Sequence, residues 1–337
     1  MKTPLAGLAL LGLLAAALAA PVPKEAAKTA GILVLDDSDR DFKGKAVYED
    51  NLHFFGTDGK ERFHLSGFNN AQTYSGTRMI ATDPARKSIW VLENVAHRVR
   101  RFDLAGKELA VIEGVKGTAL AVDPETGNVW AATNSRFGGG GEIRVYSPKG
   151  EKVATHDVAA WDLVYDPKAK AFWAAEKSLT KLAAKDGKML VQKKLSDWCA
   201  SSVAVNPTTG DVWVAVREHS QVAGSANELI RFDGDGEAKA TIALADRCPW
   251  RVAVEPKSGH CWVAIAGRGV REYTPAGKLV AELDVDAALG VEIDPAGDGV
   301  WVLTKTDTRL LSFAGKELRK VAHKKPTDQA WIAAYKE

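Results

Sequence analysis

A tryptophan recurs along the chain at nearly regular distances, and this repeat limits the possible folds more than any other feature. The recurring residues are Trp90, Trp130, Trp173, Trp213, Trp262 and Trp301. The intervals between them are 40, 43, 40, 49 and 39 residues, which is the range typical of β-propeller blades. No stretch has the length and 3.6-residue apolar period of a helix. The repeat unit is therefore expected to consist of strands.

Each unit carries the signals of short strands joined by tight turns. An apolar run such as 119–122 is followed by Asp123-Pro124 or a relative of that pair. Proline fixes φ in the turn, the preceding acid or amide accepts a backbone hydrogen bond, and a later glycine such as Gly127 permits positive φ. The tryptophan lies on the return strand, and a third strand ends in an aromatic residue four positions before a glycine, as in Phe102 and Gly106. A fourth strand after this second turn completes a four-stranded antiparallel blade.

The two ends of the chain look like the separated parts of a further blade. Six units are complete between about residues 74 and 321. The segment 31–36 (GILVLD) matches SIWVLE with Leu33 in the tryptophan place, residues 51–67 supply the third and fourth strands, and DQAWIAAYKE from Asp328 resembles the start of a unit. We therefore predict an all-β, seven-bladed β-propeller of four-stranded blades, closed by pairing of the N- and C-terminal strands. Six blades are the alternative count, and a β-helix or open solenoid is the competing architecture.

The strings SIWVLENVAHRVRRFDLAGKELAVIE and GNVW…EIRVYSPKGEKVA resemble NHL and YVTN repeats over nearly the whole mature chain. This resemblance implies a propeller, and propellers of this kind include scaffolds, ligand-binding proteins, lactonases and streptogramin-lyase-like enzymes. The lyase family carries a Trp-aromatic-Thr-Glu run, to which Trp90-Val91-Leu92-Glu93 and Trp173-Ala174-Ala175-Glu176 are similar except at the two middle positions. The Glu-Gly-Pro and Asn-Asp motifs of the gluconolactonase-like family have no counterpart in the chain.

The N-terminus has the pattern of an export signal. Lys2 precedes an apolar run from Leu5 to Leu18, and small residues at Ala17 and Ala19 suit a signal peptidase. We expect residues 1–19 to be a signal peptide, 20–30 a flexible leader and 31–337 one propeller domain, secreted or periplasmic. The apolar run is shorter than the roughly 20 residues that span a bilayer, so no membrane span is expected.

The charge balance is close to neutral, with 45 Lys and Arg against 43 Asp and Glu. Such a balance does not suggest nucleic acid as a partner. We expect a monomer whose partner is an unidentified protein or a polar small molecule.

Tryptophans outside the repeat position are the candidates for ligand contact. Recurrence at one blade position indicates packing between blades, whereas Trp161, Trp198 and Trp250 lie where the first strand of a blade begins, around the expected channel mouth. Two roles are open for these three, contact with a ligand or capping of the core, and capping is the commoner role. Arg251 follows Trp250 and is a further candidate for binding a polar ligand.

Three carboxylates occupy the same place at the end of a second strand: Asp36, Glu93 and Glu176. Oxygen ligands of this type suit calcium or magnesium, and such an ion would polarise a lactone carbonyl or acidify an α-proton. The alternative is that acidic residues begin solvated loops. His97 and His219 belong to the same loops and are weak candidates for a general base, but neither has the spacing of a catalytic triad or a nucleophile elbow.

The three cysteines are not equivalent. Cys199 and Cys248 occupy corresponding places in adjacent units, so a disulfide between neighbouring inner strands and a pair of thiols are both open. Cys261 directly precedes Trp262, where other units carry an apolar residue, and is expected to be buried.

These features together favour an exported module that binds a ligand or a protein at its channel mouth, with no chemistry of its own and no cofactor. The alternative is a metal-dependent lactonase or a streptogramin-lyase-like enzyme, for which a divalent cation such as calcium would be required.

Overall fold

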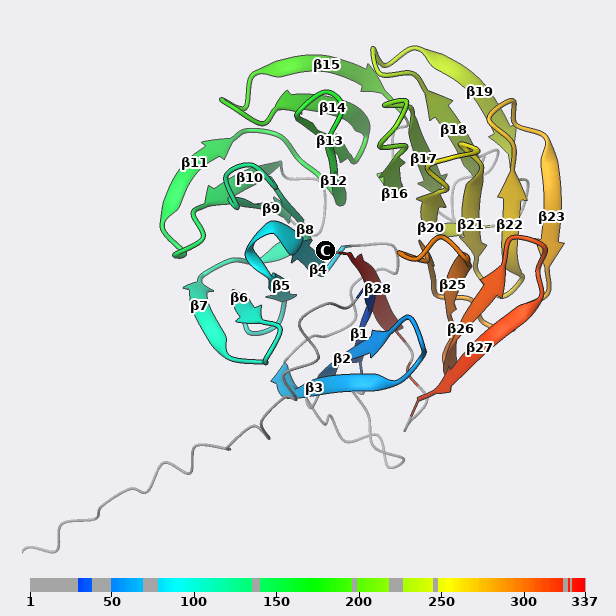
Figure 1. Ribbon diagram of the computed structural model, residues 1–337. Helices are drawn as coiled ribbons and strands as arrows, with labels where there is room; N and C mark the ends of the chain where they lie inside the picture. Colours follow the sequence, from blue (N-terminus) through cyan, green and yellow to red (C-terminus); the bar gives the residue numbers. More distant parts are fainter. Residues whose placement is uncertain are drawn as a thin grey trace, which may run out of the picture.

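The chain forms a closed ring of seven four-stranded antiparallel sheets around one axis (Figure 1). The computed structural model describes residues 30–37, 50–68, 78–134, 140–195, 199–217, 227–244, 248–323, 327 and 329–336. Within these residues the one helical element is a 3₁₀ turn at Pro84–Arg86. The all-β, seven-bladed propeller is therefore confirmed, and the alternative count of six blades is wrong because the two ends of the chain combine into a full sheet.

Six blades are continuous in sequence and follow one another around the ring. The first blade consists of β4 (Ile80–Asp83), β5 (Ser88–Glu93), β6 (Arg98–Asp103) and β7 (Glu108–Glu113). The second consists of β8 (Gly117–Val122), β9 (Val129–Asn134), β10 (Gly141–Tyr146) and β11 (Lys152–His156). The third consists of β12 (Asp162–Asp166), β13 (Ala171–Ala175), β14 (Ser178–Ala183) and β15 (Met189–Lys194).

The remaining continuous blades have the same order of strands from the axis to the rim. The fourth consists of β16 (Cys199–Val205), β17 (Val212–Arg217), β18 (Glu228–Phe232) and β19 (Ala238–Ala243). The fifth consists of β20 (Pro249–Val254), β21 (Cys261–Ile265), β22 (Gly269–Tyr273) and β23 (Leu279–Leu283). The sixth consists of β24 (Gly290–Ile293), β25 (Gly299–Leu303), β26 (Asp307–Ser312) and β27 (Glu317–Ala322).

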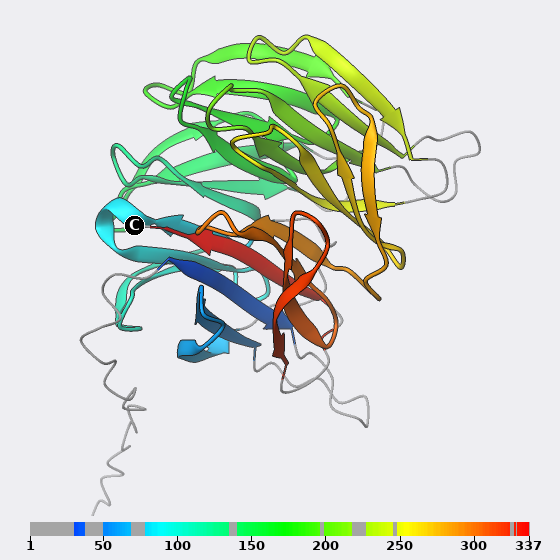
Figure 2. The same cartoon turned by 45° about the vertical axis from the view of Figure 1, so that its right-hand side comes forward.

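The closing blade joins the two ends of the chain. It is made of β28 (Gln329–Tyr335), β1 (Gly31–Asp37), β2 (Asp50–Gly56) and β3 (Glu61–Phe68) in that order from the axis. β28 pairs antiparallel with β1 along its whole length, from Gly31 opposite Tyr335 to Asp37 opposite Gln329. Figure 2 shows the red C-terminal strand beside the blue N-terminal one. The predicted closure is therefore confirmed, including the three strands predicted for the N-terminal segment.

The turn between the first and second strands of the continuous blades has the predicted chemistry. In the second blade, Asp123 Oδ1 accepts the backbone N–H of Glu125 at 3.0 Å, Asp123 Oδ2 accepts the hydroxyl of Thr126 at 2.6 Å, and Gly127 has φ of 75°. In the fourth blade, Asn206 Oδ1 accepts the N–H groups of the second and third residues after it. A short acid or amide before proline thus satisfies the turn backbone and sets the direction of the return strand.

The repeated tryptophans form the core between blades. All six are buried, and Trp130 stacks on Phe172 of the next blade with ring centroids 4.1 Å apart. The indole N–H of Trp301 donates to Asp294 of its own turn at 2.8 Å. In the closing blade, Leu33 holds the tryptophan position and lies opposite Ala333 of the innermost strand. The packing interpretation of the repeat is confirmed.

The ring has two different ends. The innermost strands β4, β8, β12, β16, β20, β24 and β28 all begin at one end, which we call the mouth end, and all finish at the other end, where the six from β4 to β24 are followed by Asp-Pro-type turns. Because the strands alternate in direction, the connections between second and third strands and those between blades also lie at the mouth end. Residues 1–29, which contain the expected signal peptide and most of the leader, lie outside the described residues. None of the helical structure in the described residues is long and apolar enough to cross a membrane.

Candidate functional site

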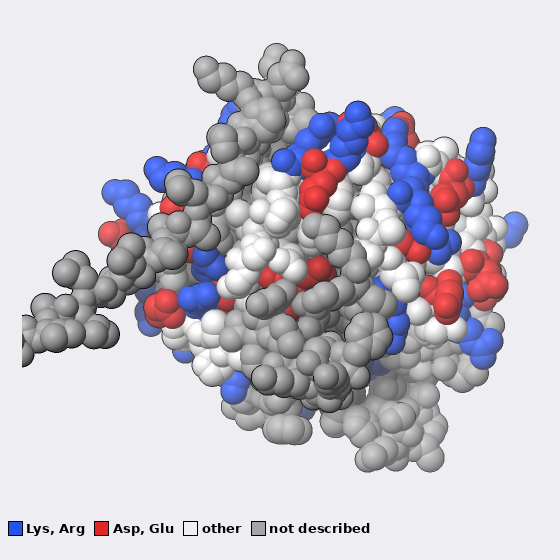
Figure 3. Space-filling view, turned by 90° about the horizontal axis from the view of Figure 1, so that it is seen from below, with Lys and Arg blue, Asp and Glu red and all other residues white. Residues whose placement is uncertain are grey.

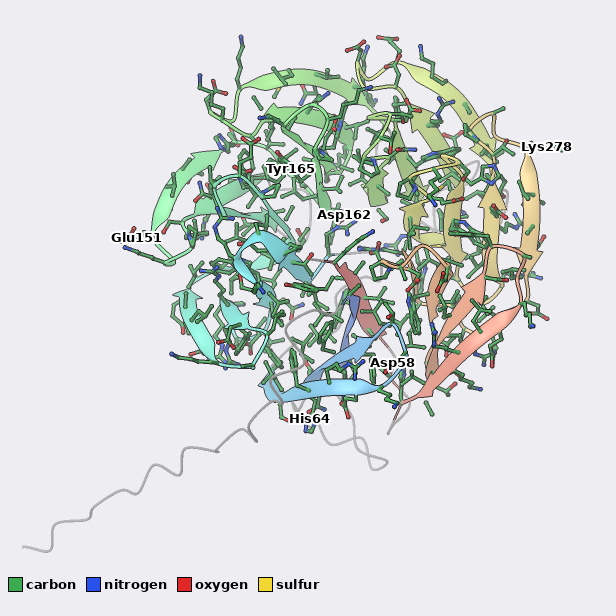
Figure 4. The ribbon with its side chains drawn as sticks, in the orientation of Figure 1. Asp58, His64, Glu151, Asp162, Tyr165 and Lys278 are labelled. Carbon is green, nitrogen blue, oxygen red and sulfur yellow. The ribbon has the colours of Figure 1, made fainter. Side chains whose placement is uncertain are left out.

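Small residues occupy most of the innermost strands at the level of the repeated tryptophans. The residues paired with the tryptophan position are Ala81, Ala121, Val164, Ala204, Ala253, Glu292 and Ala333. Glu292 is the only charged residue among these seven. Two residues nearer to the mouth end, charged side chains appear again, as Asp162 in β12 and Arg251 in β20. Figure 4 shows Asp162 close to the ring axis, whereas Glu151 and Lys278 lie at the periphery.

Asp162 is the centre of a polar cluster that joins several blades. Its Oδ1 accepts the backbone N–H of Leu163 at 2.9 Å and the Nε–H of Arg78 at 3.3 Å. Its Oδ2 accepts the hydroxyl of Ser202 at 3.0 Å and the N–H of Val203 at 2.9 Å. Asp162 is completely buried, and hydrogen bonds of this kind offset the cost of removing a polar side chain from water.

Two guanidinium groups flank this carboxylate. Arg78 directly precedes the first blade, yet its Nη2 also donates to the carbonyl of Val203 in the fourth blade at 3.2 Å, so its side chain reaches across the ring. Arg251 Nη1 lies 3.9 Å from Asp162 Oδ2, and its Nη2 lies 3.8 Å from Glu292 Oε2. We call Arg78, Asp162, Ser202, Arg251 and Glu292 the mouth cluster; four of its members come from four successive blades, the third to the sixth, and Arg78 comes from the segment before the first blade.

The electrostatics of the cluster are unfavourable to one of its cations. Burial lowers the pKa of Arg251 to about 10, and the nearby charge of Arg78 acts in the same direction, while Asp162 and Glu292 oppose the shift. An arginine whose pKa is displaced this far lies in a desolvated environment with another positive charge close by. Arg251 is therefore buried with one like charge and two opposite charges around it.

The predicted ligand contacts are distributed unevenly around this cluster. Arg251 is part of it and is almost fully buried, not placed on an exposed loop. Trp161 is half-buried, and its backbone N–H donates to Ala175 at 2.8 Å. Trp250 is half-buried against the core that the sixth and closing blades share, which fits the capping role. Trp198 lies outside the described residues. Binding of a ligand by these residues stays a prediction.

The other three charged members, Arg78, Asp162 and Glu292, were not predicted from the sequence. The usable signal was in the repeat itself. Glu292 is a charged residue at an innermost-strand position where five of the other six blades carry Ala, and Asp162 is one at a position where three of the other six carry Ala, Ser or Gly. A charge that replaces a small residue at an aligned inner position points toward the axis of the ring, because small residues at that place are what a narrow channel requires.

The structure does not bring the three carboxylates considered as metal ligands together. Asp36 accepts the backbone N–H of Asn51 at 2.7 Å in the closing blade. Glu93 is fully buried in the first blade and binds Arg98 through both oxygens, at 2.9 and 3.0 Å. Glu176, in the third blade, accepts the N–H of the residue that follows it. Over the described ranges, no group of three or more His, Cys, Asp or Glu side chains is arranged to hold a metal ion.

The histidine and cysteine candidates are only partly described. His97 is exposed in the turn between β5 and β6, with φ of 53°, and His219 lies outside the described residues. Cys248 is half-buried, and burial raises the pKa of its thiol. The side chain of Cys199 lies outside the described residues, so the bridge between these two stays a prediction. Cys261 is buried, as expected.

A second polar cluster, also missed from the sequence, lies in the closing blade. His53 Nδ1 lies 2.6 Å from Glu61 Oε1, and its Nε2 lies 3.4 Å from Asp36 Oδ2. Burial lowers the pKa of His53, but hydrogen bonds and charge attraction from Asp36 and Glu61 outweigh this, so the pKa is raised overall. The space-filling view from the side of the closing blade shows both acidic and basic side chains on this side of the molecule (Figure 3).

Comparisons with known proteins support the fold alone. The chain is similar to a chain of the solved structure of hydrazine synthase from Kuenenia stuttgartiensis, with a TM-score of 0.63 and 14% sequence identity. The similarity covers 83% of this chain and 91% of that one. No family model matches the sequence, and no curated protein matches it either.

Proposed function

We propose that this chain is an exported module that binds a polar small molecule or a segment of another protein over the mouth end of its channel, without chemistry of its own. The observation that carries the proposal is the mouth cluster. Burying charged groups costs free energy. Apolar contacts between blades hold the propeller together, so the fold itself does not require these charges. At the position of Glu292, five of the other six inner strands carry Ala.

The position of the cluster also supports binding. It lies toward the end of the ring where the connections between blades and between second and third strands gather, and such connections on a rigid scaffold commonly form binding sites. Ser202 links the cluster to its neighbours, since its Oγ accepts the N–H of Val252 at 3.3 Å and donates to Asp162. The polar groups are thus held in place before a ligand arrives, which lowers the entropic cost of binding.

The remaining parts of the proposal come from the sequence. The N-terminal pattern favours secretion or a periplasmic location, and the similarity of the repeats to NHL and YVTN repeats favours a scaffold or binding role. A monomer is proposed because the ring already pairs the two ends of the chain and needs no second subunit to close.

The test is a thermal-shift screen of the purified chain against small organic acids, amines, sugars and short peptides. Each compound that raises the melting temperature is then measured by calorimetry on wild type, Arg78→Gln and Glu292→Ala. Glu292→Ala introduces the residue that most other blades carry at that place, so it should preserve the fold. We expect at least one compound whose affinity falls in both variants. If binding of every compound is unchanged in both variants, the mouth cluster is not the site.

A further inference from the structure

The strongest unassigned feature of the mouth cluster is the way in which Arg78 is held. Its Nε and Nη2 are fixed by Asp162 and by the carbonyl of Val203, and its side chain is 16% exposed. For its Nη1, the described part of the chain provides no hydrogen-bond partner. A guanidinium fixed along one side presents its remaining N–H groups in a defined direction, as in sites that recognise planar anions.

We infer that the ligand of the mouth cluster carries a carboxylate, which binds the open side of Arg78 and is attracted by Arg251. This inference rests on the proposed function and specifies the class of ligand. It is favoured over a cationic ligand because two guanidinium groups lie at the site, within reach of the same buried carboxylate. Asp162 already accepts four hydrogen bonds, so it has little capacity left to bind an incoming ammonium group.

The number of charges favours a monoanion over phosphate. The cluster contains two arginines and two carboxylates, Asp162 and Glu292. A single added negative charge can be stabilised by the N–H groups of Arg78 and the charge of Arg251. A dianion would meet the repulsion of both carboxylates in a poorly solvated site, where charge interactions are stronger than in water.

The test compares three probes of the same shape on the wild-type chain: benzoate, benzamide and benzylamine, which are anionic, neutral and cationic at pH 7.5. Isothermal titration calorimetry should give an affinity for benzoate at least about tenfold above the other two, as expected for a charge-assisted contact with arginine. Inorganic phosphate is measured in parallel and should bind more weakly than benzoate.

Two variants locate the binding. Arg78→Gln should weaken benzoate binding about tenfold or more, whereas Arg271→Gln should leave it unchanged. Arg271 is a matched control because its side chain is 12% exposed and paired with Glu282 on the outer strands of the fifth blade. Thermal unfolding of each variant checks that the ring is intact, and the three-probe comparison on wild type stands even if Arg78→Gln is unstable.

Other results would overturn the inference in distinguishable ways. If benzylamine or benzamide binds best and Arg78→Gln abolishes that binding, the mouth is a binding site but its ligand is not anionic. Phosphate binding tighter than benzoate would assign a dianion. If none of these compounds binds, or if no binding depends on Arg78, the carboxylate inference fails, and the broader screen under the proposed function then decides whether the mouth binds anything else.

Discussion

The third blade and the closing blade are both four-stranded antiparallel sheets, but they take their strands from the chain in different ways. The third blade is one continuous segment with Trp173 at its centre, and Lys181 Nζ lies 4.9 Å from the centre of that ring. Lys181 also donates to the carbonyl of Gly234 in the next blade at 2.7 Å. The closing blade is joined from both ends of the chain and has neither a tryptophan nor a cation at these places.

In the closing blade, other aromatic residues fill the space. Phe54 of β2 lies opposite Leu33 of β1. The ring centroids of Phe63 and Tyr335 lie 5.5 and 5.8 Å from the ring centroid of Phe54. The comparison teaches that the propeller requires a filled volume between blades more than it requires a tryptophan. It also shows that the closing blade depends on pairing between residues about 300 positions apart in the chain, which has a high entropic cost during folding.

The largest effect is expected from removing the C-terminal strand. Deleting residues 328–337 takes β28 away, with the buried side chains of Trp331, Ile332 and Tyr335, and leaves β1 as an unpaired inner edge. Each of these side chains contributes roughly 1.5–3 kcal/mol, and 1 kcal/mol corresponds to somewhat less than about 2 °C in a folded domain of about 300 residues. The melting temperature followed by circular dichroism should fall by about 10 °C. A chain that ends at Tyr335 is the control, and equal melting of both would refute closure by β28.

A repeated tryptophan should matter nearly as much. Trp130→Ala removes a buried ring stacked between Phe172 and His156, at centroid distances of 4.1 and 5.0 Å. We expect the free energy of unfolding to fall by about 3–5 kcal/mol, because a large cavity between two blades cannot collapse fully. Urea denaturation measures this value. A change below about 1 kcal/mol would show that the tryptophans do not carry the packing between blades.

The reverse substitution in the closing blade sharpens the comparison. Leu33→Trp introduces the residue that every continuous blade carries at this position, but Phe54 and Tyr335 already occupy the surrounding space. Overpacking should lower the free energy of unfolding by about 1–3 kcal/mol, measured by the same urea denaturation. A more stable variant would mean that the closing blade merely lacks its tryptophan and has not been filled in another way.

Much of this fold could be predicted from the sequence because its determinants are local. Asp123-Pro124 with Gly127 defines a turn by its own hydrogen bonds. The alternating apolar runs define which side chains of a strand face the core. Even the closing blade followed from local similarity, since Leu33 occupies the tryptophan place within a recognisable strand pattern. Each of these signals depends on neighbours within a few residues.

The mouth cluster could not be predicted in the same way because its contacts depend on the width of the ring. Arg78 meets Asp162 from 84 positions away and Val203 from 125, and no pattern along the chain encodes the distance across the channel. Only the position of Arg251 at the start of an inner strand was accessible beforehand. The same limit applied in the closing blade, where His53, Asp36 and Glu61 lie on three separate strands.

The smallest effect is expected from His53. It makes the contribution of the closing blade to the free energy of unfolding depend on pH. Both ring nitrogens of His53 face carboxylate oxygens, and only the protonated imidazolium can donate to both. The raised pKa means that the folded chain binds the proton more tightly than the unfolded chain does. The stabilisation is therefore fully present below pH 6.5, the ordinary pKa of histidine, and is lost as the pH rises through the folded-state value.

His323 at the end of the neighbouring sixth blade complicates a simple pH profile, because burial lowers its pKa and its contribution to stability changes with pH in the opposite direction. The informative measurement is thus the difference between wild type and His53→Gln, followed by urea denaturation from pH 5.5 to 8.5. Wild type should be the more stable at the acidic end by up to about 1 kcal/mol, as for a partly exposed ion pair, and the difference should shrink as the pH rises.

His64→Gln is the control. The His64 side chain is half-exposed, and its Nδ1 lies 3.7 Å from Glu61 Oε1, farther away than that of His53, so its removal should change the pH profile little. A difference that grows toward alkaline pH would show that His53 is neutral in the folded ring and that Asp36 and Glu61 do not hold the three strands of this blade through its charge.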